Sequence, residues 1–180
     1  MRVITGTARG RKLRQPEGRA IRPTTEIVKE ALFNIIQFDV EGRRVLDLFA
    51  GTGQLGIEAL SRGAKSAVFV DESASALKLV RDNLALCGLE GDVVRSDAES
   101  FVSRGGKFDL IFLDPPYDGE LLDRILLKII RFDILSDGGI IICEASRDKC
   151  LAPPDEPYFL GKEYRYGKTK LVVFGRHATN

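Results

Sequence analysis

The alternation of strand-like and helix-like segments between residues 43 and 146 constrains the fold of this chain most strongly. Short apolar runs alternate with longer segments that carry apolar residues at helical spacing. Because parallel strands need a crossover connection, this order favours a mainly parallel sheet with helices on both faces. We therefore predict an α/β fold. Its strand-forming segments are expected at 43–50, 66–71, 92–97, 108–117 and 138–146.

The two ends of the chain depart from this alternation. Residues 1–22 are rich in glycine and arginine, which favours a basic arm or small hairpin. Residues 157–174 hold two β-like runs with no room for a crossover helix, so an antiparallel hairpin is predicted at the sheet edge. The remainder, residues 23–180, is expected to form one globular domain.

A helix is predicted over residues 23–38, ahead of the first strand of the sheet. Its apolar stripe consists of Ile27, Ala31, Ile35 and Phe38, widened by Val28, Leu32 and Ile36. We expect this stripe to face the core.

Composition is typical of a globular protein that can bury a core. The chain has 180 residues, of which 44% are hydrophobic and 29% charged. Its apolar runs are too short for a membrane span, and no signal-peptide apolar region follows the basic N-terminus. Cys87, Cys143 and Cys150 lack metal-site spacing, so we expect reduced thiols, no metal and a cytoplasmic protein.

The net charge of +1 conceals an uneven distribution. Residues 1–22 hold seven basic side chains and one acid, and residues 162–176 hold five and one. The middle of the chain is therefore acidic. Charge alone fits either a polyanion-binding footprint built from both ends or two solvated ends.

A glycine-rich loop at residues 47–56, DLFAGTGQLG, follows the first predicted strand and matches the pattern GxGxxG. Such a loop lets backbone N–H groups approach a ligand at the positive end of a helix. Asp71, with Glu72 beside it, ends the second strand, where a carboxylate can accept both hydroxyls of a ribose. The residues of the loop predicted to contact a cofactor are Phe49, Ala50, Gly51 and Gly53.

Acids at three successive strand ends favour S-adenosylmethionine over a dinucleotide. Asp47 precedes the glycines, where it could meet the amino group of a cationic ligand but would repel a pyrophosphate. Asp97 ends the third strand, where it could accept a hydrogen from an adenine amine or cap the next helix. The predicted cofactor is S-adenosylmethionine.

The tetrapeptide DPPY ends the fourth predicted strand, at the edge where open α/β sheets bind ligands. An exocyclic amine is a poor nucleophile, so a catalyst must hold both hydrogens and aim the nitrogen at the methyl group. Asp114 can accept one hydrogen of the amine, and the carbonyl of Pro115 can accept the other. Asp114 is also predicted to contact the cofactor. Tyr117, after Pro116, offers a stacking face worth about 1–3 kcal/mol. The same four residues are also typical of a tight turn, which is the alternative interpretation.

These motifs together resemble the family of bacterial 16S rRNA guanine-N2 methyltransferases that modify guanine 966. The resemblance rests on DLFAGTGQLGIEALSRGA, FVDES, DNL, LDPPY and the opening RPTTEIVKEALFNII. It implies a Rossmann-like class I methyltransferase sheet of seven strands, mostly parallel, whose last two strands form an antiparallel hairpin.

The resemblance also implies roles for single residues. Gly51 and Gly53 would approach the methionine part of S-adenosylmethionine, and Asp71 its ribose. Asp97 and Ala98 would contact its adenine. The aspartate, first proline and tyrosine of DPPY would hold the target guanine.

The substrate implied by the resemblance is 16S rRNA in an assembled or partly assembled 30S subunit, and we expect a monomer. Basic residues would neutralise RNA phosphates, which positions the RNA without choosing the base. The predicted RNA-binding residues are Arg9, Arg11, Lys12, Arg14, Arg22, Lys168 and Lys170.

Other functions fit parts of the sequence. DPPY-like tetrapeptides also serve adenine-N6 methyltransferases of DNA or RNA and protein glutamine methyltransferases, because all act on a planar NH2 group. A nicotinamide-dependent oxidoreductase would fit GxGxxG but leaves DPPY unexplained. A catalytically silent RNA-binding module would keep the basic ends without needing the cofactor acids.

Overall fold

A seven-stranded sheet forms the centre of the structure, a computed structural model that describes residues 1–16, 23–116 and 120–178. The strands are β1 Arg44–Asp47, β2 Ser66–Asp71, β3 Asp92–Arg95, β4 Phe108–Leu113, β5 Leu135–Ser146, β6 Tyr158–Tyr166 and β7 Thr169–Arg176. Their order is β3-β2-β1-β4-β5-β7-β6. The first five strands are parallel, and β7 runs antiparallel to β5 and β6. The predicted fold class and terminal hairpin are confirmed.

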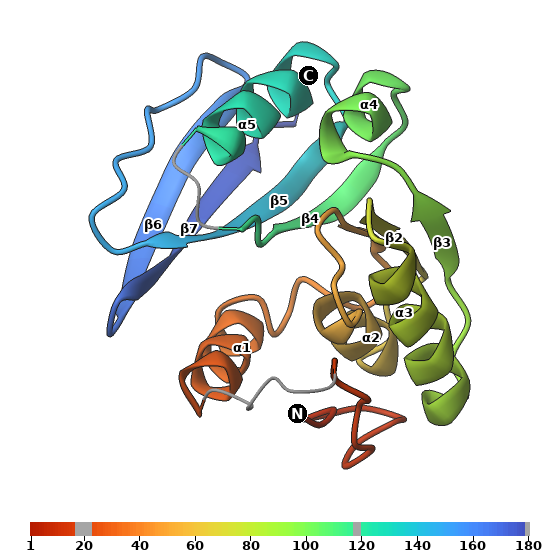
Figure 1. Ribbon diagram of the computed structural model, residues 1–180. Coiled ribbons are helices and arrows are strands. Elements are labelled where there is room, and N and C mark those ends of the chain that lie inside the picture. Colours follow the sequence, from red (N-terminus) through yellow and green to blue (C-terminus); the bar gives the residue numbers. More distant parts are fainter. Residues whose placement is uncertain (17–22, 117–119, 179–180) are drawn as a thin grey trace.

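Helices cover both faces of the sheet (Figure 1). They are α1 Pro23–Ile35, α2 Gln54–Ser61, α3 Ala74–Cys87, α4 Ala98–Ser103 and α5 Leu121–Arg131. One hydrophobic cluster joins α1, α2 and α3 to one face, and a second joins α4 and α5 to the other. No helix in the described ranges is long and apolar enough to cross a membrane.

Helix α1 and the residue after it bury most of the predicted stripe, and Ala31 and Ile35 pack against the core. Its side of the core is made by Val28, Leu32, Phe33 and Ile36. Ile27 and Phe38, which we expected to face the core, are 59% and 90% exposed. Because α1 ends at Ile35, Phe38 no longer follows the helical period. The ring of Phe33 meets that of Phe112 edge-on, with centroids 5.7 Å apart, which fixes α1 over β4.

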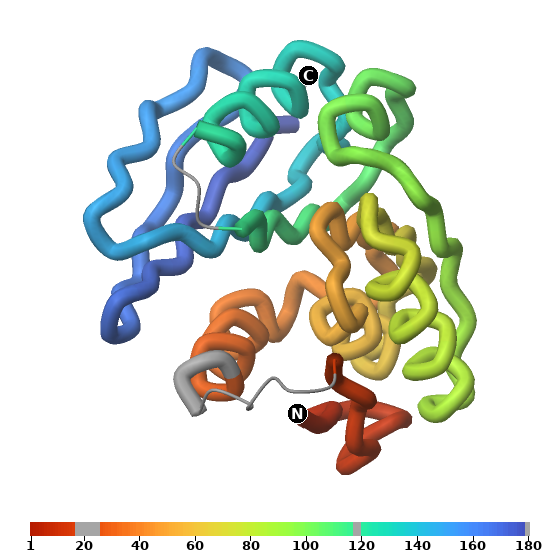
Figure 2. Tube along the Cα trace, in the orientation of Figure 1, coloured from red at the N-terminus to blue at the C-terminus, as the bar shows by residue number. Residues whose placement is uncertain are grey.

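The first thirteen residues fold back on themselves beside α1 and α2, as Figure 2 shows in red. Arg2 and Lys12 form an antiparallel bridge, and Val3, Ala8 and Leu13 are buried in the cluster that contains α1 and α2. This geometry agrees with the predicted small hairpin. The described part of the arm packs on the same core as the sheet.

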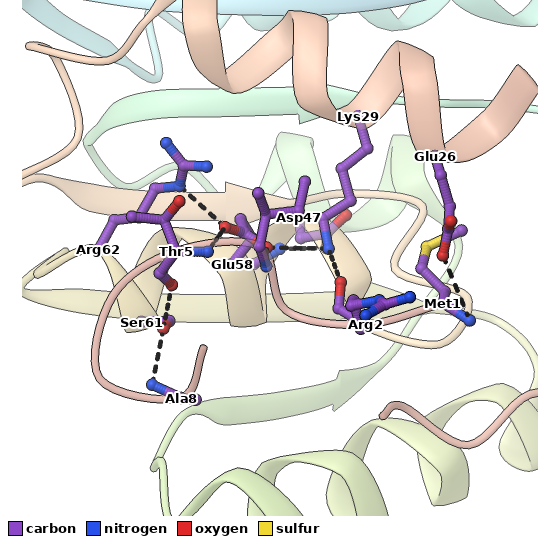
Figure 3. A network of polar contacts seen from close by, with 12 residues as sticks. Met1, Arg2, Thr5, Ala8, Glu26, Lys29, Asp47, Glu58, Ser61 and Arg62 are labelled. Atoms are coloured by element: carbon purple, nitrogen blue, oxygen red, sulfur yellow. Dashed lines mark hydrogen bonds and ion pairs between the residues drawn. The ribbon is translucent and has the colours of Figure 1, made fainter. Parts of the chain in front are cut away.

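A buried ion network holds this arm in place (Figure 3). Glu58 on α2 is fully buried, and its carboxylate accepts the N–H groups of residues 4–5 at 2.8 and 3.0 Å. The same carboxylate lies 2.9 Å from both Lys29 Nζ and Arg62 Nε. Lys29 also donates to the carbonyl of Arg2 at 2.9 Å. One carboxylate therefore connects α1, α2 and the arm.

Candidate active site

Three carboxylates lie on one face of the sheet, at the carboxyl ends of β1, β4 and β5. Asp47 pairs with Phe112, whose ring belongs to the cluster under α1. Asp114 and Glu144 directly follow the paired residues of β4 and β5. Since side chains alternate along strands, both continue the face of Phe112. The site-forming acids come from three neighbouring strands.

Burial and like charges raise the pKa values of Asp114 and Asp47. The pKa of Asp114 lies well above its usual range, because burial and then the charges of Glu144 and Asp47 disfavour its ionised form. Burial raises the pKa of Asp47 to about 7, although Gly56 N–H donates to its Oδ2 at 2.9 Å. The site therefore favours a ligand that brings positive charge or hydrogen-bond donors.

Asp47 lies beneath the glycine loop and is only 2% exposed. We predicted that it meets the amino group of a ligand. In the structure its carboxylate accepts the N–H of Gly56, in the first turn of α2, and the predicted ligand contact stays a prediction. Asp47 thus holds the loop on the end of β1.

Replacing Asp47 with asparagine is expected to stabilise the ligand-free protein by up to about 4 kcal/mol at pH 8. The folded-state pKa of about 7 is above the ordinary value of 3.8. The stability linked to this group is therefore fully present below the unfolded pKa and is lost as the pH rises through 7. Asparagine keeps an acceptor for Gly56 N–H and removes the charge. Urea unfolding at pH 4 and pH 8 measures the effect, and an equal gain at both values would contradict it.

The glycine loop has the open geometry that the motif predicts. Gly51 and Gly53 have φ angles of +53° and +77°, which favour glycine. A Cβ on Gly51 would meet nothing within 4 Å, so the backbone there faces open space. The side-chain Oε1 of Gln54, next along the loop, is buried and has no hydrogen-bond partner among the described residues. The loop therefore has room for a ligand and a buried acceptor beside it.

One acid of the predicted cofactor site, Asp71, is engaged by two backbone N–H groups. Asp71 accepts Gly51 N–H at 2.9 Å on one oxygen and Ser73 N–H at 2.8 Å on the other. Each carboxylate oxygen can accept a further hydrogen bond. Glu72 beside it is exposed. Asp71 thus joins the glycine loop to the end of β2.

Asp97 adopts the capping role that we had left as an alternative. Its Oδ1 accepts Ser100 N–H at 2.8 Å at the start of α4, and this hydrogen bond lowers its pKa. Ala98 is buried in the first turn of the helix. Of the predicted loop contacts, Phe49 is half-buried and Ala50 is buried, with its N–H bonded to the carbonyl of Val70.

The DPPY segment is described as far as its second proline. Asp114 is half-buried, Pro115 is buried and Pro116 is exposed. Tyr117 lies outside the described residues, so its predicted stacking role stays a prediction. The described part places Asp114 and Pro115 directly after β4, where Asp114 lies near Glu144 and Asp47.

The predicted RNA-binding residues divide into exposed and buried groups. Those that are exposed are Arg9, Arg11, Lys12, Arg14 and Lys168, whereas Arg22 lies outside the described residues. Lys170 is buried, and its Nζ pairs with Glu163 Oε1 at 2.8 Å. We predicted that Lys170 binds RNA, and in the structure its ammonium is buried and engaged by Glu163.

Two arginines that sequence reasoning missed line a polar cavity of about 360 Å³ at the end of β5. Arg147 follows this strand and donates to the carbonyl of Gly167 at 3.3 Å. Arg165 lies on β6, in the same row as Lys170 of β7 and Ala145 of β5. No local motif marks either arginine, since only strand pairing brings them together. Groups of acids, histidines and cysteines suited to a metal ion are not found among the described residues.

A family model and two relatives named as methyltransferases match nearly the whole chain. A family model described as conserved hypothetical protein 95 matches residues 1–175. The Bacillus subtilis protein YlbH is 39% identical over 180 residues, covering 97% of this chain and 98% of its own. Ribosomal RNA small subunit methyltransferase D of Escherichia coli K12 is 33% identical over 180 residues, covering 99% of this chain and 91% of its own.

Solved structures share the fold. The structure of Escherichia coli yhhF matches with a TM-score of 0.89 and 33% identity, covering 99% of both chains. The protein SMU.776, solved in complex with SAH, matches with a TM-score of 0.69 over 86% of this chain and 50% of its own. At 18% identity this second likeness concerns the fold alone.

Proposed function

The chain belongs to the family described as conserved hypothetical protein 95, and on that premise we propose that it methylates 16S rRNA with S-adenosylmethionine. The target in this proposal is the N2 amine of a guanine of the 966 type, in an assembled or partly assembled 30S subunit. The relatives named small subunit methyltransferase D support an rRNA substrate. One observation carries the proposal. An open glycine loop on β1 and the Asp-Pro-Pro segment on neighbouring β4 meet at one sheet edge.

The residues at the ends of β1, β2 and β3 fit S-adenosylmethionine. Gly51 leaves open space at the loop, and Gln54 offers a buried acceptor without a described partner. Asp71 and Glu72 stand where a ribose would be held, and Asp97 with its helix where adenine would lie. When bound, the cofactor supplies an electrophilic methyl group on a positively charged sulfur. That charge suits the surrounding carboxylates, whose pKa values are raised by burial.

Asp114 and the carbonyl of Pro115 hold the two hydrogens of the target amine in the proposed mechanism. This leaves the third direction of the nitrogen free, so alignment supplies most of the rate. Losing its lone pair makes the amine acidic, and Asp114 then takes a proton. Its raised pKa makes its carboxylate a stronger base for that proton. Helix α1 packs over the same face of β4 through Phe33 and Phe112.

The exposed bases of the arm position the RNA in this proposal. Changing Arg9 and Arg11 together to glutamine is expected to raise KM for small-subunit particles. It should also reduce the salt slope of binding by about 1.4, because each single-stranded phosphate contact contributes about 0.7. SAH affinity is expected to stay unchanged. The measurement is particle binding between about 50 and 200 mM salt. The control is Lys65→Gln, which changes an exposed base before β2. An unchanged salt slope in the double variant would contradict RNA binding by the arm.

Methyl transfer from labelled S-adenosylmethionine tests the proposed reaction. Small-subunit particles that lack the modification are expected to become labelled in 16S rRNA, whereas large-subunit particles stay unlabelled. A thermal shift with SAH, and none with NAD, is expected in parallel. Stabilisation by NAD alone would contradict the proposed cofactor. We further propose that the protein acts as a monomer in the cytoplasm. Size-exclusion chromatography with light scattering tests the monomeric state.

A further inference from the structure

Glu144 is an acid of the candidate site to which the proposed mechanism gives no task. It lies at the carboxyl end of β5, one residue past the pair formed by Leu113 and Cys143. Directly opposite on β7 is Leu171, which is buried in the cluster under α1. Residues directly opposite each other in a sheet present their side chains to the same face. Glu144 therefore faces the α1 side of the sheet.

Asp114 occupies the equivalent place at the end of the adjacent strand β4. Adjacent strands lie about 4.8 Å apart, so the two carboxyl groups lie within reach of one small planar ligand. Their proximity is unfavourable on its own, since the charge of Glu144 helps to raise the pKa of Asp114. A ligand that presents two hydrogen-bond donors side by side matches the two neighbouring carboxyl groups.

Guanine carries such a pair of donors on its Watson–Crick edge. Its N1–H stands next to its N2 amine, so a base whose amine is held by Asp114 turns N1–H toward a neighbouring group. Adenine presents an unprotonated N1 next to its N6 amine, and this lone pair would be repelled by a carboxylate. A glutamine side chain has the amine but no adjacent ring N–H.

We propose that Glu144 accepts the N1–H of the target base and thereby selects guanine. This inference rests on the proposed function, because it assumes that Asp114 holds the amine of a base. It makes Glu144 a specificity-determining residue, which contacts the substrate beside the reacting nitrogen. In this proposal Asp114 holds the amine, and Glu144 accepts the ring N1–H.

The test compares guanine with 2-aminopurine at the target position, in small-subunit particles reconstituted from ligated rRNA. The analogue keeps the N2 amine and lacks N1–H. Wild-type protein is expected to prefer guanine by on the order of 10- to 100-fold in kcat/KM. Glu144→Ala should lower kcat/KM for guanine by a similar factor and leave that for 2-aminopurine nearly unchanged. Glu144→Gln should also reduce the preference, since its amide can donate to the unprotonated N1 of the analogue.

Equilibrium binding provides a readout that does not depend on turnover. With SAH present, particles carrying guanine should bind wild-type protein more tightly than particles carrying 2-aminopurine, and the difference should vanish in Glu144→Gln. Glu90→Ala, an exposed acid far along the chain, is the control and should keep the preference. SAH affinity reports whether each variant is folded. If Glu144→Ala does not fold, the near-isosteric Glu144→Gln variant tests the role of Glu144.

The two possible failures are distinguishable. If wild-type protein labels no guanine in rRNA, the proposed function is wrong and the inference falls with it. If wild-type protein labels guanine and 2-aminopurine equally well, the methyltransferase stands and the role of Glu144 is overturned. A preference that survives unchanged in both Glu144 variants would also overturn that role.

Discussion

Replacing Asp114 with alanine is expected to lower kcat for methyl transfer by about 1,000-fold while changing SAH affinity by less than about threefold. The alanine variant leaves one amine hydrogen unheld, so the nitrogen lone pair stays delocalised and poorly aimed. Asp114 lies at the end of β4 and not in the glycine loop, so the cofactor surface on β1 and β2 remains intact. Single-turnover rates and SAH titration measure the two effects separately.

Two matched variants sharpen this experiment. Asp92→Ala removes an exposed acid at the opposite, amino end of β3 and should leave both values unchanged. Asp114→Asn keeps an acceptor for the amine hydrogen but cannot take a proton. Intermediate activity in the asparagine variant would assign the two tasks to one side chain. Wild-type turnover in Asp114→Ala would contradict the role of the aspartate altogether.

Replacing Glu58 with alanine is expected to destabilise the protein by about 3–5 kcal/mol. The change strands the buried ammonium of Lys29, which lies 2.9 Å from the carboxylate. It also removes the acceptor for two N–H groups at residues 4–5. The arm should then detach from α2, and affinity for small-subunit particles should fall with it.

Urea unfolding measures this loss, and limited proteolysis within residues 1–16 reports release of the arm. Glu99→Ala is the control, because Glu99 pairs with Arg124 and Lys128 at the surface and should cost less than about 1 kcal/mol. Combining Glu58→Leu with Lys29→Met removes both charges and should recover much of the stability. A loss below about 1 kcal/mol in Glu58→Ala would show that the network does not anchor the arm.

The sheet could be predicted because its signals are local. Each strand from β1 to β4 is a short apolar run followed by a helical pattern, and the connection between β6 and β7 is too short for a crossover. The helix α1 was harder, since its end at Ile35 decides that Phe38 is exposed. A periodic pattern cannot show where a helix stops when no strong C-cap residue marks the end.

The candidate site was predicted where a motif carries the chemistry. The glycine loop and the Asp-Pro-Pro segment meet at one edge of the sheet, as the order of strands requires. Lys170 and Glu144 depended on pairing across strands that are distant in sequence. Alternation along β7 turns Lys170 into the packed hairpin, and the register of β5 brings Glu144 beside Asp114. Neither placement follows from neighbours in the sequence.

The buried network around Glu58 escaped prediction for a related reason. Lys29 and Glu58 have charges that usually mark the exposed face of a helix. Both are buried here because each lies in the contact between two elements and meets a partner there. Charged residues that form pairs only after packing cannot be separated from surface residues by periodicity.

Identification of the methylated nucleoside tests the proposed activity most directly. Small-subunit particles that lack the modification are incubated with the protein and labelled S-adenosylmethionine, and the rRNA is then digested to nucleosides. The label is expected in N2-methylguanosine, at one position of 16S rRNA, and to disappear with Asp114→Ala. Label in a methylated adenosine, or in ribosomal protein, would contradict the guanine-N2 assignment.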